Sequence, residues 1–541
     1  MTAEPTETTS LLPREEGVRE PPKNDDKPVD TGLSWKRLLG IIGALLGVFL
    51  AGADESMVLV TFQTIASHFK QLGDSPWVLA GYNLGYCVAL PVYGKLSDTY
   101  GRQIPLVVAY CLFSGGCIFS GSAAALWHVI VGRVITGIGA AGMVALVCVL
   151  ITDNVPPSQV AITRSYVNMV SVFGRVLGGP IGAFITDSVG WQLSFVVQAP
   201  TAIMCCIISI ALLPPSKPKD KNVKKIPLRK RVDFLGIGMF AISITTFLVA
   251  IRLLGDHEAS TRITILFGVV SAVFGGFFLV VEAYYAREPV IPPGLLKSMA
   301  GPYAVQVLLQ VGVFGKFDKT LRPISFAPQV QVVHELQFIL LQYFYTLFTL
   351  FDITMRLASW DDETDHSLLV TFRTHRYKTL SIISVLLGLT FFTLIAVRWR
   401  TGVSGWESLY VFPAFLSFGL LLSTTFTGLI ACTPKSIHAT AICVYYLCQQ
   451  VGTMLGTVFS SLTIETILRE VLRIRLEDIP SKMEIIERVL HDSNPDIIPE
   501  ALRSIVRSSY LYSFQFAAFI PVITTAIVLP LMAIDREVEV E

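Results

Sequence analysis

The feature that most constrains this chain is a series of apolar stretches, each of about the length that a helix needs to cross a lipid bilayer. About 30 Å of hydrocarbon requires ~20 helical residues. The first six stretches run approximately over 38–60, 77–96, 104–124, 126–151, 163–186 and 191–213. A pair follows at 234–253 and 263–286, and a later set covers 301–314, 379–397, 408–431, 437–462 and 511–534. The sequence therefore predicts an all-α protein that crosses the membrane many times.

The composition agrees with this and excludes several classes of protein. Of the 541 residues, 52% are hydrophobic and only 15% are charged, whereas a soluble protein carries roughly 25% charged residues. A soluble enzyme and a disordered protein are therefore excluded, and the net charge of +1 indicates no nucleic-acid partner. The nine cysteines lie in apolar runs without CxxC spacing, so we expect neither disulfides nor a metal site. The sequence has no phosphate-binding loop motif, and we expect no cofactor.

The distribution of Lys and Arg predicts which ends of the spans face the cytosol. Basic residues gather in the first 37 residues, in the loop after the second stretch and in segment 214–232, whereas the loops after the third and fifth stretches contain none. We therefore expect a cytosolic N-terminus. The predicted parts are a disordered cytosolic tail, a six-helix half, a basic cytosolic linker, an extra helix pair, a second half and an acidic tail, over residues 1–36, 37–213, 214–232, 233–288, 289–534 and 535–541. Six-helix halves with the substrate site between them are a recurring transporter plan.

The polar N-terminal tail carries one short motif. Glu7, Leu11 and Leu12 fit the acidic dileucine pattern that sorting adaptors bind on cytosolic tails. A sorting adaptor is therefore an expected partner, although so short a pattern also arises by chance.

An acidic pair lies inside the first apolar stretch. A carboxylate at the centre of a bilayer costs about 2.5–3.5 kcal/mol on insertion scales, so Asp54 is expected to face a cavity, to be protonated, or to alternate between the two. Such alternation is what a proton-coupling site needs, because desolvation favours the neutral carboxyl and wetting favours the carboxylate. The alternative is a carboxylate near a helix end that contacts water, and this alternative is favoured for Glu55, on another face of the helix.

Three short motifs resemble signatures of the major facilitator superfamily. The loop after the second stretch has Gly94, Asp98, Gly101 and Arg102 at the spacing of that family's gating loop. Segment 131–142 resembles the fourth-span signature and contains Arg133. Segment 174–182 resembles the fifth-span motif of antiporters, in which small residues allow close helix packing and a proline bends the span. Its motif residues are Gly174, Gly178, Gly179, Pro180 and Gly182.

Four further segments resemble one branch of the superfamily. Residues 53–56, 82–87, 151–153 and 164–168 look like fungal vacuolar basic amino acid transporters, which belong to the fourteen-span drug:proton antiporters. The resemblance implies the major facilitator fold, with two pseudo-symmetric halves that rock about a mid-membrane site. It implies that lysine, arginine or histidine moves from the cytosol into the vacuole in exchange for protons.

The resemblance also implies that Arg133 takes part in proton transfer, and the alternative is a structural arginine bonded to backbone carbonyls. A cationic substrate needs acidic or dipolar partners in a low-dielectric cavity. The proton-coupling and substrate candidates are therefore Asp54, Glu55, Asn83, Arg133 and Asp153.

Two segments of the second half depart from the family pattern. Residues 311–372 lack the expected end of the ninth span and the Gly-rich tenth, and the resemblance resumes after them. We hypothesise a retained intron or a wrong gene model, which an uninterrupted mature transcript encoding this segment would refute. Residues 465–508 alternate apolar and charged positions at helical spacing, which predicts an amphipathic lumenal loop of one or two surface helices.

The sequence leaves other functions open. A plasma-membrane exporter of drugs or toxins would use the same proton-coupled machinery. A nutrient sensor that does not transport would keep the same fold, and a damaged 311–372 segment would leave an inactive product.

Overall fold

Regular structure in the computed structural model is helical throughout the residues that it describes. Those residues are 35–71, 74–153, 160–212, 233–254, 260–285, 291, 293–314, 377–398, 407–434, 437–477 and 500–534, with single positions between 483 and 489. Ten helices in this part of the chain are long and apolar enough to cross a membrane, and the apolar segments Leu235–Ile251 and Ala300–Val313 are shorter. The predicted all-α, polytopic architecture is confirmed.

The N-terminal half is a bundle of long helices. They are α1 (Trp35–His68), α2 (Pro76–Tyr100), α3 (Gln103–Gly121), α4 (Leu126–Thr152) and α5 (Val160–Val189). The sixth span is made of a short helix α6 (Trp191–Val196) followed directly by α7 (Gln198–Leu212). Helix α1 packs on α5, while α4 packs on both α2 and α3. The half is thereby arranged around α4, most of whose side chains are buried.

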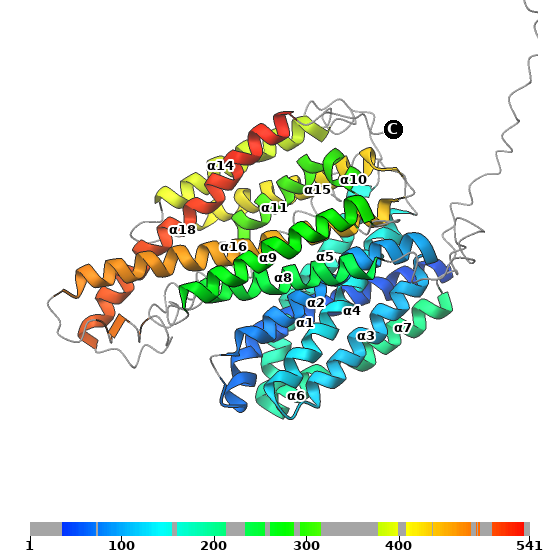
Figure 1. Cartoon of the computed structure of the whole chain (residues 1–541), viewed down its shortest axis with the longest axis horizontal. Coiled ribbons are helices and arrows are strands. Elements are labelled where there is room, and N and C mark those ends of the chain that lie inside the picture. The colour runs from blue at the N-terminus through cyan, green and yellow to red at the C-terminus, as the bar shows by residue number, and fades with distance from the viewer. Residues whose placement is uncertain are drawn as a thin grey trace, which may run out of the picture.

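The extra helix pair is a hairpin between the two halves. Helix α8 (Phe234–Leu254) packs along α9 (Thr261–Val280), which ends in a π-helical turn, η5 (Val281–Tyr285). Helix α8 also contacts α2 and α16. Figure 1 shows this green hairpin lying across the junction between the blue and cyan N-terminal half and the yellow to red C-terminal half.

The C-terminal half is described in part. Its helices are α10 (Pro293–Ser298), α11 (Ala300–Phe314), α14 (Tyr377–Arg398), α15 (Val411–Cys432), α16 (His438–Arg475) and α18 (Glu500–Ile534), with a 3-10 turn, η7 (Glu407–Tyr410), before α15. Helix α14 packs on α15 and α18, and α11 packs on α16 and α18. Of the atypical segment 311–372, residues 311–314 form the end of α11, and the rest lies outside the described residues.

The segment predicted as an amphipathic loop, 465–508, differs from that expectation at both ends. Helix α16 continues without a break to Arg475, and α18 already begins at Glu500. The cause is a leucine stripe at a spacing of four residues, Leu468, Leu472 and Leu476, which extends the helix beyond its most apolar part. The stripe packs into a small separate core together with Ile486, Val489 and Val506.

Candidate functional site

Asp54 of α1 and Arg133 of α4 form an ion pair inside the N-terminal half. Nη1 of Arg133 donates to both Asp54 carboxylate oxygens, at 2.9 and 2.7 Å. The side chains are 1% and 0% exposed for Arg133 and Asp54 respectively. The guanidinium carbon lies 4.5 Å from the centre of the Tyr82 ring on α2, within the range of a cation–π contact. The sequence predicted both residues as candidates, and the structure brings them together.

Close helix packing places this pair. A Cβ atom on Gly178 of α5 would lie 2.2 Å from the carbonyl oxygen of Ala53, the residue before Asp54. Only a residue without a side chain lets α5 approach α1 this closely. Gly174 and Gly182 likewise face α1, against Phe49 and Met57.

The other two residues of the predicted antiporter motif lie differently. Gly179 has more room, because its nearest neighbour would be Ser56 Oγ at 3.1 Å. Pro180 lies inside α5 and is exposed. The glycines at every fourth position of the motif, Gly174, Gly178 and Gly182, therefore form the contact surface with α1.

Glu55 forms a second ion pair, with Arg175 of α5. The Nε of Arg175 donates to Oε2 of Glu55 at 2.9 Å. Unlike the first pair, this one is accessible, with 39% of the Arg175 side chain and 43% of the Glu55 side chain exposed. Both residues lie within segments long and apolar enough to span a membrane, Leu39–Phe62 and Tyr166–Val189. Because exposed charges are costly against lipid, this surface must contact water.

Asn83 connects the two halves. Its side-chain oxygen accepts a hydrogen bond of 3.2 Å from Nε2 of Gln450 on α16. Close to this bridge, a Cβ atom on Gly452 would lie 2.8 Å from Cβ of Gln310 on α11. Gln306 and Gln310 are 0% and 1% exposed, and in the described part of the chain their side-chain amides have no hydrogen-bond partner. Polar side chains of both halves thus lie close together, at a similar depth along the helix bundle.

The loop between α2 and α3 holds a separate charge cluster. The Arg102 guanidinium donates from Nη1 to Asp98 Oδ1 and Ser97 Oγ, both at 3.0 Å, and from Nε to Asp153 Oδ2 at 2.8 Å. Gly101 has a φ of 84°, which favours glycine and turns the chain sharply between the helices. Burial by itself lowers the pKa of Arg102, but the carboxylates of Asp153 and Asp98 raise it above its ordinary value overall.

The same loop contacts the C-terminal half. The Oδ2 atom of Asp98 accepts hydrogen bonds from the backbone N–H and the hydroxyl of Thr440, at 3.2 and 2.9 Å. Thr440 lies in the first turn of α16, where the helix dipole favours a carboxylate. A Cβ atom on Gly94 would lie 3.1 Å from Cβ of Cys443. All four predicted gating-loop residues therefore belong to one junction between the halves.

The structure places the predicted candidate Asp153 at the gating loop, away from the pair of Asp54 and Arg133. This residue caps the end of α4 and pairs with Arg102 of the gating loop. It lies 20 residues beyond Arg133 on the same helix, which is about 30 Å at 1.5 Å per residue. Asp153 therefore belongs to the loop junction and not to the site around Asp54.

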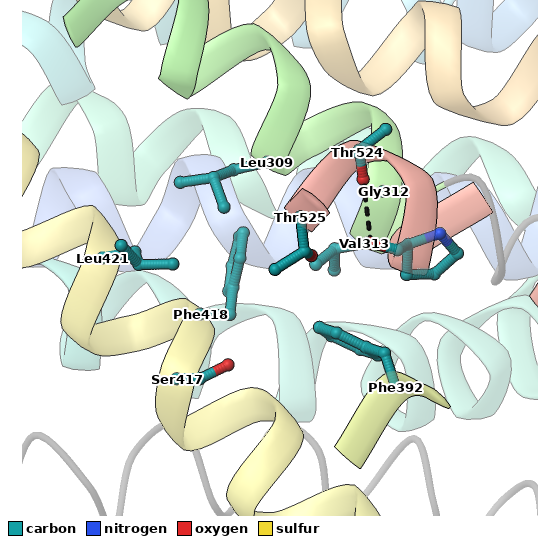
Figure 2. A pocket seen from close by; sticks show the side chains of 10 residues that line it. Leu309, Gly312, Val313, Phe392, Ser417, Phe418, Leu421, Thr524 and Thr525 are labelled. Atoms are coloured by element: carbon teal, nitrogen blue, oxygen red, sulfur yellow. Dashed lines mark hydrogen bonds between the residues drawn. The ribbon is translucent and has the colours of Figure 1, made fainter. Parts of the chain in front are cut away.

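A small void lies elsewhere, inside the C-terminal half (Figure 2). It is enclosed by α11, α14, α15 and α18 and lined mainly by apolar side chains such as Leu309, Phe392 and Phe418. Thr524 beside it donates to the Pro521 carbonyl oxygen at 3.2 Å. The void has room for about one water molecule, so it is a packing gap and too small for a substrate.

Sequence reasoning missed three residues of these sites. Arg175 was treated only as part of a helix-packing motif, although an arginine inside an apolar span is itself a signal of function. Gln450 and Thr440 lie in the C-terminal half, and no local pattern marks them as partners of Asn83 and Asp98. The predicted sorting residues Glu7, Leu11 and Leu12 lie outside the described residues.

The chain is similar to two proteins named as vacuolar amino acid transporters and to one named as a multidrug resistance protein. It is 28% identical over 519 residues to a vacuolar membrane amino acid uptake transporter of Schizosaccharomyces pombe, covering 93% of this chain and 85% of that protein. It is 25% identical to vacuolar basic amino acid transporter 1 of Saccharomyces cerevisiae, covering 86% and 84%. It is also 27% identical to a multidrug resistance protein of S. pombe, covering 87% of each.

A solved structure shows the fold of this chain, and a family model shows its family. The crystal structure of the human organic anion transporter MFSD10 superposes with a TM-score of 0.54 at 10% identity, over 90% of this chain and 99% of that one. The family model described as Major Facilitator Superfamily matches residues 44–457. The chain therefore belongs to the Major Facilitator Superfamily and is a multi-pass membrane secondary transporter rather than an enzyme.

Proposed function

We propose that the protein is a proton-coupled antiporter that moves basic amino acids from the cytosol into the vacuole. The observation that carries this proposal is the ion pair of Asp54 and Arg133, buried within two spans of the N-terminal half. The names of the vacuolar amino acid transporters among its relatives support the substrate class and the membrane.

The buried pair suits proton coupling for an electrostatic reason. A carboxylate and a guanidinium neutralise each other, so the pair is tolerated in a low-dielectric interior, whereas either charge alone is costly there. Protonation of Asp54 leaves Arg133 without its counter-ion and changes the relative energy of conformations that bury or hydrate it. Proton binding and helix rearrangement are thereby coupled through one contact between α1 and α4.

The junction of the gating loop with α16 supplies the second element of alternating access. Asp98 and Thr440 join the halves at the end of the bundle that the charge distribution predicts to be cytosolic. Substrate entry from that side requires this contact to open. In the state described here it is closed, so the state is the one that bars the predicted cytosolic entrance.

Transport by purified protein in liposomes tests the proposal. With an acidic lumen, the protein should accumulate labelled lysine, arginine or histidine, and a proton ionophore should abolish the accumulation. Asp54→Asn should abolish gradient-driven accumulation while retaining exchange of labelled for unlabelled lysine at equal pH.

Asp187→Asn, which removes an exposed acid of α5, serves as the control and should behave like the wild type. Absence of any basic amino acid uptake, or uptake indifferent to the proton gradient, would refute the proposal.

A proton-coupled drug exporter at the plasma membrane is the second candidate, favoured by the multidrug resistance protein among the relatives. It predicts that deletion of the gene sensitises cells to toxic cations and that the liposomes take up such cations in place of lysine.

A further inference from the structure

The exposure of the ion pair of Glu55 and Arg175 is not explained by a role in helix packing. The pair of Asp54 and Arg133 is closed off from its surroundings and shows the geometry expected of a structural ion pair. Glu55 and Arg175 instead keep about two-fifths of their side-chain surface open in the middle of two apolar spans. The Nε of Arg175 bonds one oxygen of Glu55, so the other donors of its guanidinium can face a ligand.

The residues around Glu55 and Arg175 lie on the side of the N-terminal half that faces the C-terminal half. Glu55 directly follows Asp54, whose partner Arg133 lies 4.5 Å from the centre of the Tyr82 ring on α2. The ring of Tyr82 packs against that of Tyr86, with 6.0 Å between the ring centres. Between these two tyrosines on the same helix, Asn83 bonds Gln450 of α16. Helix α5 itself contacts α15. The pair therefore lies on the surface of the N-terminal half near the place where the two halves meet.

An accessible pair of one anion and one cation matches a ligand that carries both charges. We infer that Glu55 and Arg175 form the binding site for the zwitterionic part of an amino acid, with the α-carboxylate on Arg175 and an ammonium group on Glu55. This inference rests on the proposed function and names its recognition site. Guanidinium binds carboxylate through two parallel hydrogen bonds, and the displaced Glu55 carboxylate is then available to an ammonium group.

The exchange of partners keeps the site neutral. Before binding, the two protein charges compensate each other, and after binding each protein charge is compensated by a ligand charge. A cationic compound without a carboxylate leaves Arg175 uncompensated when it takes Glu55, and an unpaired charge at this depth is costly. The pair therefore selects amino acids against simple cations.

Lysine and lysinamide distinguish this site from other modes of binding, because lysinamide keeps both amino groups and lacks the carboxylate. In liposomes with wild-type protein, lysine should be taken up with a KM about 10- to 100-fold lower than lysinamide, the effect of one charge-assisted interaction. Arg175→Gln should abolish the preference: the KM for lysine should rise because its carboxylate loses its partner, and the KM for lysinamide should fall because no arginine is left uncompensated when it takes Glu55. Arg175→Lys, which keeps the charge, should restore part of the preference.

Controls separate this inference from the proposed function and from loss of folding. Arg473→Gln removes the same side chain from an exposed Arg–Glu pair with Glu470 and should leave the preference intact. Thermal stabilisation of each purified variant by lysine reports binding independently of transport. If wild-type protein takes up lysine but Arg175→Gln weakens lysine and lysinamide equally, the inference is wrong and the proposed function stands. If wild-type protein takes up neither compound, the proposed function itself is wrong.

Discussion

At the scale of single residues, the buried pair gives a stability prediction. Removing one member leaves an uncompensated charge in the interior, a loss of about 3–5 kcal/mol in buried pairs. Asp54→Asn and Arg133→Gln should therefore each lower the unfolding temperature of the detergent-solubilised protein. The double variant, with two neutral amides, should unfold at a higher temperature than either single variant. Additive losses in a double-mutant cycle would contradict a direct interaction between the two side chains.

The residues of the site were predictable to different degrees. Asp54 was found because a carboxylate in an apolar span is costly, and Arg133 through a resemblance of its motif. Their pairing was not predicted, since they are 79 positions apart in the sequence and only the packing of α1 and α4 brings them together. The sequence also offers Asp153 as a candidate because it is acidic and follows a span, but the continuous helix α4 separates it from Arg133 by about 30 Å.

At the scale of helices, the contact between α1 and α5 gives a matched pair of variants. Gly178→Ala places a Cβ atom 2.2 Å from a backbone oxygen of α1, which cannot rotate away. Overpacking of this kind costs about 1–3 kcal/mol and should lower the unfolding temperature and impair transport, because the shift also displaces Asp54 and Glu55. Gly115→Ala on α3 meets no atom within 4 Å and should be neutral. Equal effects of the two substitutions would show that close approach is not what Gly178 provides.

Apolar length predicts the helices well and their ends poorly. The stretch predicted over 437–462 is part of α16, which extends to Arg475. The hydropathy of its last turns is too low to predict them, although Leu468 and Leu472 keep one face of the helix apolar. The division between α6 and α7 was likewise not predicted, since the sixth stretch is apolar throughout. Hydropathy measures affinity for lipid, whereas helix ends depend on side-chain packing with other segments.

At the scale of the whole molecule, location is the property that separates the vacuolar transporter from a plasma-membrane exporter. If the dileucine motif of the N-terminal tail is used, replacing Leu11 and Leu12 with alanine should move a fluorescently tagged protein from the vacuolar membrane to the plasma membrane. Replacing Leu39 and Leu45 of α1 with alanine instead provides a control for leucine content and should leave the location unchanged. An unchanged location of the Leu11 and Leu12 variant would exclude the motif as the sorting signal.

The arrangement of the two halves gives the last prediction, which concerns alternating access. Sequence patterns divide the chain into halves but do not show which residues join them. The structure places Gly94 against Cys443, and a Cβ atom on Gly94 would lie 3.1 Å from Cβ of Cys443. This is a few tenths of an ångström below the usual range for a disulfide, so Gly94→Cys, in a background whose only native cysteine is Cys443, should form a disulfide under oxidation. The bond should stop lysine uptake by holding the junction closed, and a reductant should restore the uptake.

Gly94→Ala is the control, because it adds a similar Cβ atom without the thiol. Its transport should be insensitive to oxidant. If the crosslinked protein transports at the rate of the reduced protein, the junction of Asp98 with Thr440 does not open during the cycle and alternating access must use other contacts.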